Sequence, residues 1–267
     1  MVIVSWLLVI CGLLLAAKSA KLLALMDSAK STQTANDPII DALFAVGAHF
    51  GYRRSRRHPS AAPVIFGVKG TVEIFDLEKT KSALAAAEDF VTGLAKAGKT
   101  ILFVGGKKEA AEAIVSGATA LGMPFVASRW IGGTLTNFGQ IRGRVDRMLD
   151  LRAKREKGEL AKYTKKERLL IDRDIARSEE LFGGIVPLAA LPAALFVIDP
   201  RAEETAMREA RKQKIPMAAL ANSDCDMSAI TYPIPGNDAS RASIKFFVDR
   251  IVSAYQAGKT IPPVVIS

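Results

Sequence analysis

The residues best suited to chemistry lie just after short apolar runs of the chain. The letters VGGKK at 104–108, IDPR at 198–201 and NSDCD at 222–226 each follow such a run. The carboxyl ends of parallel strands form the ligand crevice of an open α/β sheet, so these loops are expected to lie together. A helix is expected after the two glycines, and its free N–H groups make 104–108 resemble a phosphate-binding turn. One hypothesis is therefore an enzyme that binds a phosphorylated ligand through Gly105, Lys107, Asp199 and Asp226.

This candidate crevice lacks the pattern of a known enzyme class. The glycine turn fits neither the dinucleotide-binding nor the ATP-binding motif, so a nucleotide cofactor is not expected. Asp199, Asp224 and Asp226 could together hold a divalent cation. However, an aspartate just before Pro200 is typical of a helix N-cap, and aspartates in a polar loop commonly form Asx-turns. Neither His49 nor His58 has a neighbour that marks a catalytic triad or a metal site. We expect no catalytic residue, no metal and no cofactor.

The densest charge in the chain is the run from Tyr52 to His58. Four guanidinium groups fall within five residues there, and planar guanidinium groups match phosphate oxygens in bidentate pairs. Tyr52 is available to stack on a base. A solvated loop is the alternative, and we favour contact with an RNA backbone. Arg142 and Arg144 continue the positive charge, although acidic residues alternate with the basic ones beyond them, as on a solvated helix face.

Charge and cysteine content narrow the class of protein. The chain has 37 Lys and Arg against 27 Asp and Glu, a formal net charge of +10 over 267 residues. Such a balance favours a polyanionic partner, either nucleic acid or an anionic membrane surface. Cys11 and Cys225 are too few and too far apart for a disulfide framework, which fits a reducing compartment.

The first 25 residues leave two interpretations open. Residues 1–17 carry no charge, and Lys18 and Lys21 follow, as in a short membrane anchor or a signal sequence without its basic start. Insertion would still keep the basic part cytoplasmic. A start assigned too far upstream, with translation from Met26, is the interpretation that we favour. A membrane-tethered interaction protein stays an alternative hypothesis, although a membrane partner is not our expectation.

The rest of the chain alternates between apolar runs and amphipathic stretches. A short helix is expected from Asp37 to Gly47, then a hairpin of 64–68 with 72–75, and a helix from Asp76 to about Gly98. Runs typical of buried strands are ILFV at 101–104, PFVA at 124–127, LFVI at 195–198 and PMAAL at 216–220. Helical spacing occupies 107–121, 201–213 and 238–257. This alternation predicts an α/β fold with a doubly wound parallel sheet.

One segment interrupts the alternation. Between the second and third strands, apolar residues recur every three and four positions, and Thr164 to Glu167 form a capping box that restarts a helix. Paired glycines at 132–133 and 183–184 bracket the segment. We expect an inserted antiparallel helical hairpin of coiled-coil type. The predicted organisation is an N-terminal leader at 1–36, an α/β domain at 37–134 and 184–257, the hairpin at 135–183, and a tail at 258–267.

Seven motifs occur in the order in which one protein family has them. They are GAHFG (47–51), ILFVGGKKEAAEAI (101–114), RWIGGTLTNF (129–138), TKKE (164–167), LFGGI (181–185), LPAALFVID (191–199) and YPIPGND (232–238). Together they cover residues 38–257, and on them the chain resembles bacterial small-subunit ribosomal proteins of the S2 family. The chain departs from the family pattern at Tyr52, where histidine is usual, at Arg57, where tryptophan is usual, and at Ala193, where aspartate is common. NSDCDM at 222–227 also replaces the usual DTNCDP.

The resemblance implies a flavodoxin-like sheet with a protruding helical hairpin and no catalysis. It implies a structural constituent of the small ribosomal subunit, acting in translation in the cytoplasm, with ribosomal RNA and other small-subunit proteins as partners, including the large S1 protein, and no small-molecule substrate. Trp130 suits either RNA contact or a core anchor, and its indole N–H needs a partner in either case. The residues expected to bind RNA are Tyr52, Arg53, Arg54, Arg56, Arg57, Lys107, Lys108, Arg129, Trp130, Thr134, Asn137, Arg142 and Arg144.

Overall fold

A parallel sheet of five strands forms the centre of the protein. The computed structural model describes residues 37–260, so the predicted leader and most of the predicted tail lie outside the described residues. The strands are β4 (Ile101–Val104), β5 (Phe125–Val126), β6 (Ala194–Ile198), β7 (Met217–Ala221) and β8 (Tyr232–Pro235), arranged in the order β5-β4-β6-β7-β8. All four strand pairs are parallel. This is the flavodoxin-like strand order, and the predicted α/β class is confirmed.

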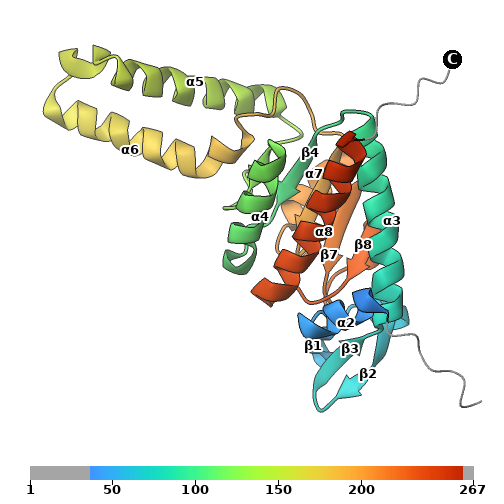
Figure 1. Cartoon of the computed structure of the whole chain (residues 1–267). Coiled ribbons are helices and arrows are strands. Elements are labelled where there is room, and N and C mark those ends of the chain that lie inside the picture. Colours follow the sequence, from blue (N-terminus) through green and yellow to red (C-terminus); the bar gives the residue numbers. More distant parts are fainter. Residues whose placement is uncertain (1–36, 261–267) are drawn as a thin grey trace, which may run out of the picture. The chain divides into compact units, whose positions relative to one another are not determined.

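Helices flank this sheet, as the alternation of apolar and amphipathic stretches predicts. Helices α3 (Leu77–Lys96), α4 (Lys108–Leu121) and α8 (Arg241–Thr260) pack on one another and lie in front of the strands in Figure 1. The short helix α7 (Glu204–Lys212) places Ala206, Met207 and Ala210 in a buried cluster with Leu102 and Leu195 of the sheet. Central strands β4, β6 and β7 are buried at every position, which explains their uninterrupted apolar sequences.

Strand β8 is the one strand of this sheet that the apolar runs did not predict. It contains Pro233 and Pro235, and a proline cannot donate a backbone hydrogen bond to a neighbouring strand. The structure accommodates both because β8 lies at the edge of the sheet and pairs with β7 alone. A strand that contains prolines is tolerated at an edge, because the backbone groups on its outer side have no neighbouring strand to pair with.

A small antiparallel sheet precedes the parallel one. The predicted hairpin is confirmed as β2 (Ile65–Lys69) and β3 (Val72–Phe75), with Lys69 opposite Val72. Strand β1 (Phe50–Arg53), which the sequence did not predict, pairs with the other side of β3. Helix α2 (Pro38–Ala45) and Asp76, which accepts from the N–H of Glu78 at the start of α3, also match the prediction.

Two long helices follow β5. Helices α5 (Phe138–Glu156) and α6 (Lys165–Phe182) run side by side in Figure 1, and a short 3-10 turn (Glu159–Lys162) lies between them in the chain. Each helix buries apolar residues against the other, and Arg152 pairs with Glu179 across them at 3.8 Å. Both hydrogen bonds of the Thr164–Glu167 capping box are present at the start of α6. The exact domain boundaries given above remain a prediction.

No helix between residues 37 and 260 combines the length and the hydropathy that a membrane crossing needs. Residues 1–17, on which the anchor hypothesis rests, lie outside this range.

Candidate nucleic-acid interface

A single carboxylate organises the loop that joins β5 to α5. Glu209 of α7 accepts hydrogen bonds from the backbone N–H groups of Gly133 at 2.7 Å, Leu135 at 3.0 Å and Thr136 at 3.1 Å. The Thr136 hydroxyl and the indole N–H of Trp130, at 3.2 Å each, complete the set. Glu209 and Trp130 are both only 7% exposed. The loop from Trp130 to Thr136 is therefore wrapped around one buried negative charge.

The hydrogen bonds decide the ionisation of this carboxylate. Burial alone would raise the pKa of Glu209, but the backbone N–H groups of Gly133, Leu135 and Thr136, helped by the Trp130 indole, lower it below its ordinary value. Glu209 is thus held as an anion at neutral pH. Since an anion needs donors on all sides when it is buried, the negative charge fixes the path of the loop.

The loop residues expected to bind RNA divide into two groups. Trp130 and Thr134 are buried, and the Thr134 hydroxyl donates to the carbonyl of Ile131 at 2.6 Å. Their side chains are thus the core anchors of the loop. Arg129 and Asn137 are exposed at its two ends, and Asn137 directly precedes α5. The exposed pair is available to a partner, and the buried pair supports it.

The basic run forms a second loop, which is tied to the segment after β7. The N–H of Tyr52 donates to the Ser223 hydroxyl at 3.0 Å, and the N–H of His58 donates to the Ser223 carbonyl at 2.8 Å. The Ser60 hydroxyl accepts from the N–H of Met227 at 2.9 Å. These bonds fasten residues 52–60, which we call the basic loop, to the carboxyl edge of the parallel sheet.

The arginines of the basic loop have different environments. Arg57 pairs at 3.2 Å with Glu73 of β3, whose side chain is fully buried. Arg56 lies over the ring of Tyr52, with its guanidinium carbon 5.0 Å from the ring centre. Arg53, Arg54 and Arg56 are exposed. Three of the four guanidinium groups predicted to bind RNA therefore lie at the surface, and the fourth is anchored by a buried carboxylate.

The predicted phosphate-binding turn is occupied by the protein itself. The turn lies at the switch point of the sheet, after β4 and beside the end of β6. The N–H of Gly106 donates to the Glu203 carboxylate at 3.0 Å, and the ammonium of Lys107 pairs with Asp199 and with Asp238, the latter at 2.7 Å. The groups that would cradle a ligand phosphate thus already have anionic partners from within the chain.

The charged residues of this crevice shift one another's pKa values. Burial raises the pKa of Asp238, Asp199 raises it further, and Lys107 opposes both. Burial would lower the pKa of Lys107, but Asp238 and Asp199 raise it above its ordinary value, so the ammonium stays charged. The pKa of Tyr52 is raised, chiefly by burial and then by Asp238, and the nearby Lys107 ammonium opposes this shift. Lys107 and Tyr52, two of the residues expected to bind RNA, therefore meet here, whereas Lys108 is exposed.

The aspartates weighed as cation ligands have structural partners. Asp199 accepts from the N–H groups of Arg201 and Ala202 at 3.1 and 3.2 Å, and Asp226 accepts from the N–H and hydroxyl of Ser228 at 3.1 and 2.6 Å. Within residues 37–260, no group of three His, Cys, Asp or Glu side chains is placed to hold a metal ion. Asp226 forms the predicted Asx-turn. Asp199 also caps a turn, but the prediction that it is the N-cap of the next helix is wrong, because α7 begins only at Glu204 and its N-cap is Glu203.

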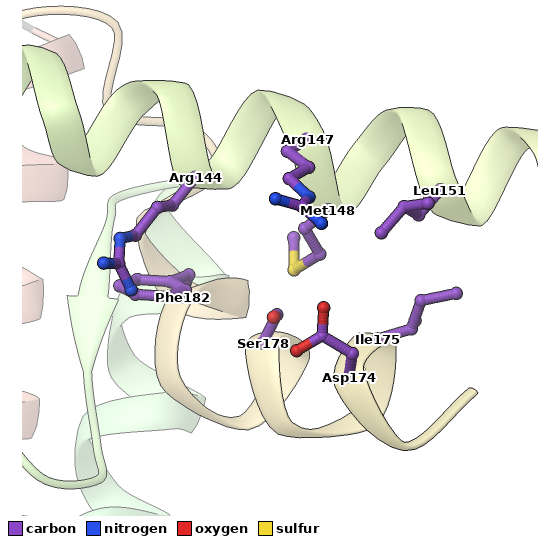
Figure 2. A pocket seen from close by; sticks show the side chains of 8 residues that line it. All are labelled: Arg144, Arg147, Met148, Leu151, Asp174, Ile175, Ser178 and Phe182. Carbon is purple, nitrogen blue, oxygen red and sulfur yellow. The ribbon is translucent and has the colours of Figure 1, made fainter. Parts of the chain in front are cut away.

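Arginines also line a hollow of about 310 Å³ between α5 and α6. Figure 2 shows Arg147 and Met148 of α5 above Asp174 and Ser178 of α6, while the side chain of Arg144 lies beside Phe182. Both arginines are exposed. Arg142, by contrast, donates to the carbonyls of Val186 and Leu188 at 3.0 and 3.2 Å and so ties α5 to the chain beyond α6. Arg144 is the better placed of the two predicted residues for an external anion.

Several residues that build these loops were missed from the sequence. Glu209, Glu203, Glu73 and Asp238 are all buried acids with specific partners. One signal was present for Glu209: it lies on the apolar face of its helix, next to Ala210 and three residues after Ala206. A charge on the buried face of an amphipathic helix predicts a partner, although not which one.

Comparisons with known proteins agree with this arrangement. Residues 43–258 match the family described as Ribosomal protein S2. The chain is 41% identical over 218 residues to small ribosomal subunit protein uS2 of Roseiflexus sp. (strain RS-1), a match that covers 82% of this chain and 83% of the relative. It is 40% identical over 215 residues to the protein of that name from Chloroflexus aurantiacus, covering 80% and 90%, and 39% identical over 219 residues to that from Desulfovibrio desulfuricans, covering 82% and 85%. The family match covers most of the chain, and the three relatives are 39 to 41% identical to it. The chain therefore belongs to the ribosomal protein S2 family.

Proposed function

We propose that this chain is a structural constituent of the small ribosomal subunit, where it binds ribosomal RNA and neighbouring proteins during translation in the cytoplasm. The match of residues 43–258 to the S2 family carries this proposal, together with relatives whose name places them in the small subunit. The crevice at the end of β4 favours a structural role over a phosphate-binding enzyme. Its Lys107 ammonium and Gly106 N–H already interact with carboxylates of the same chain.

The RNA-binding surface consists of exposed arginines and one asparagine on two supported loops and on α5. Arg53, Arg54 and Arg56 project from the basic loop, Arg129 and Asn137 border the Glu209-centred loop, and Arg144 lies on α5. Each loop is fixed from beneath by a buried group, so little side-chain and backbone freedom is lost on binding. Such contacts to phosphates position a protein on folded RNA by shape and charge, without reading the sequence.

We expect the double variant Arg53→Ala/Arg54→Ala to weaken binding to small-subunit ribosomal RNA and to reduce its salt dependence. Each arginine that neutralises a phosphate contributes about 0.7 to 0.9 to the slope of log K against log salt, so the slope should fall by about 1.4 to 1.8. Filter binding of the RNA between about 50 and 200 mM salt measures both quantities.

A matched control is Lys96→Ala/Lys99→Ala at the end of α3, which removes the same charge from two exposed positions. We expect this control to keep the wild-type slope. Equal slopes for the two double variants would mean that the basic loop contributes only to the overall charge, and would contradict the proposed surface.

We also propose that the small antiparallel sheet contacts a neighbouring ribosomal protein, with ribosomal protein S1 as the expected partner. Within the described part of the chain, β2 is an edge strand that pairs with β3 alone. Phe66 on this strand is 81% exposed and Val68 is 49% exposed. Large exposed apolar side chains beside unpaired backbone groups are typical of a surface that another protein covers.

Phe66→Ser is expected to weaken the association of S1 with reconstituted subunits at least tenfold, the loss of one well-packed aromatic contact, while RNA binding stays unchanged. Val115→Ser is the control, because Val115 is an exposed apolar residue of α4 at 39%. Pull-down of S1 by tagged subunits measures the effect. If S1 is retained equally by both variants, the edge of β2 is not its docking surface.

The overall proposal is tested by mass spectrometry of salt-washed small subunits from the native organism. Recovery of internal peptides at the stoichiometry of the other small-subunit proteins is the expected result. Recovery in free cytosol or membranes, with none in the subunit, would contradict a ribosomal role.

A further inference from the structure

A second hollow, of about 580 Å³, lies between the basic loop, α7 and the segment after β7. Its lining includes four arginines: Arg56 and Arg57 from the basic loop, Arg201 from the turn before α7, and Arg211 from α7 itself. The chain brings them together from positions up to 155 residues apart, between 56 and 211. Arg201 and Arg211 are not among the residues that the sequence motifs single out.

Two of the four guanidinium groups are held in place by carboxylates. Arg57 pairs with the fully buried Glu73, and Arg201 pairs at 2.9 Å with Asp224, whose side chain is 6% exposed. Each of these pairs involves one terminal nitrogen, and a guanidinium has five N–H donors. The remaining donors of Arg57 and Arg201 are thus oriented before any ligand arrives.

The other two arginines have no carboxylate of their own. Arg56 contacts the face of the Tyr52 ring, and Arg211 is exposed near the end of α7. Within residues 37–260, neither has a carboxylate oxygen within 4.0 Å. Two unmatched guanidinium groups that line one hollow from different elements, the basic loop and α7, are complementary to a single shared anion.

The acidic residues around the hollow do not cancel this charge. Glu204 pairs with Arg208 at 2.6 Å, and Asp224 pairs with Arg201. Asp226 accepts two hydrogen bonds from Ser228, and these bonds lower its pKa. Asp226 therefore keeps its negative charge, but the two unmatched guanidinium groups outnumber this one carboxylate, so the hollow remains positive.

We propose that this hollow binds a backbone phosphate of RNA, bridged between Arg56 and Arg211 and assisted by the fixed Arg57 and Arg201. This inference rests on the proposed function and adds α7 to its RNA-binding surface. A polymer is favoured over a free ion because Arg53 and Arg54 continue the positive charge along the exposed side of the same loop. Successive phosphates of one strand can then be met by successive arginines.

The test compares Arg211→Ala with Lys212→Ala in the full chain. The two residues are adjacent, both exposed and both on α7, but only Arg211 lines the hollow. The probe is small-subunit ribosomal RNA transcribed in vitro, and the readouts are the dissociation constant and its salt slope. We expect Arg211→Ala to weaken binding about five- to tenfold at about 100 mM salt and to lower the slope by about 1, whereas Lys212→Ala leaves the slope as in the wild type.

Two further measurements keep the outcomes separate. The double variant Arg56→Ala/Arg211→Ala should lower the salt slope by no more than the contact with one phosphate contributes. The reason is that both side chains bind the same anion. Melting curves of the wild type and Arg211→Ala in inorganic phosphate test whether the hollow binds a free ion. If phosphate raises the melting temperature of the wild type alone, while the two proteins have the same salt slope for RNA binding, the RNA assignment is overturned. Equal RNA slopes for Arg211→Ala and Lys212→Ala overturn the site itself while wild-type RNA binding persists. If the wild-type chain binds no RNA, the proposed function fails with it.

Discussion

Replacing Glu209 by alanine is expected to destabilise the protein by about 3 to 5 kcal/mol, which is a large part of the stability of a typical domain. The variant leaves three backbone N–H groups and the Trp130 indole without their acceptor in a buried region. Each unsatisfied buried donor costs about 1 to 3 kcal/mol, although the loop can recover part of this by opening to water. Urea unfolding followed by fluorescence and circular dichroism measures the change.

Glu209→Gln separates the charge from the side-chain volume. The amide keeps the shape but offers one acceptor oxygen, and its NH₂ group faces donors, so we expect a loss of about 2 to 3 kcal/mol at pH 7. The pKa of Glu209 is lowered in the folded protein, so its stabilising effect is complete above the unfolded pKa and is lost as the pH falls through the folded pKa. The difference between wild type and Glu209→Gln should therefore shrink in acid.

The control for Glu209 is Glu204→Gln on the same helix. Glu204 is exposed and forms an i,i+4 ion pair with Arg208, so its neutralisation should change stability by less than about 0.5 kcal/mol. Equal unfolding midpoints for the two glutamine variants would show that the loop does not depend on the buried charge.

Replacing Lys107 by methionine is expected to cost about 3 to 5 kcal/mol at pH 7, because Asp199 and the fully buried Asp238 lose their shared cation. Methionine retains most of the volume, so the loss reports charge and hydrogen bonding more than packing. Since Tyr52 of the basic loop interacts electrostatically with Lys107, we also expect weaker RNA binding through a less ordered basic loop. Thermal unfolding and filter binding measure the two effects.

The pH dependence of Lys107→Met has a definite sign. Without the ammonium, burial and mutual repulsion should raise the pKa of Asp238 further above its unfolded value. A carboxyl group with a raised pKa destabilises the fold as the pH rises from its unfolded pKa to the raised folded pKa, so the variant should lose less stability at acidic pH than at pH 7. Lys108→Ala, at the exposed neighbouring position, is the control and should change stability little at either pH. A pH-independent loss would mean that the two aspartates do not depend on Lys107.

The sequence determined the elements whose signals are local. Uninterrupted apolar runs predicted β4, β6 and β7, since strands buried on both faces need no polar positions. Asp76 and Thr164 marked helix starts because a cap is formed by residues two or three positions apart. The edge strand β8 escaped prediction because its prolines lower strand propensity. Strand β1 escaped because it is decided by pairing with β3, whose residues lie 19 to 24 positions further along the chain.

The sequence determined only part of the candidate site. Its basic character follows from composition, and the exposed arginines of the basic loop are visible as a run of letters. Which cations remain free is a tertiary matter: Lys107 pairs with Asp238 from 131 residues away, and Arg57 pairs with a buried glutamate of another strand. The role of Glu209 depends on a loop more than 70 residues earlier in the chain. Sequence fixes which charges exist, but their pairing depends on distances of a few ångströms, because Coulomb and hydrogen-bond energies fall steeply with separation and only the folded chain sets those distances.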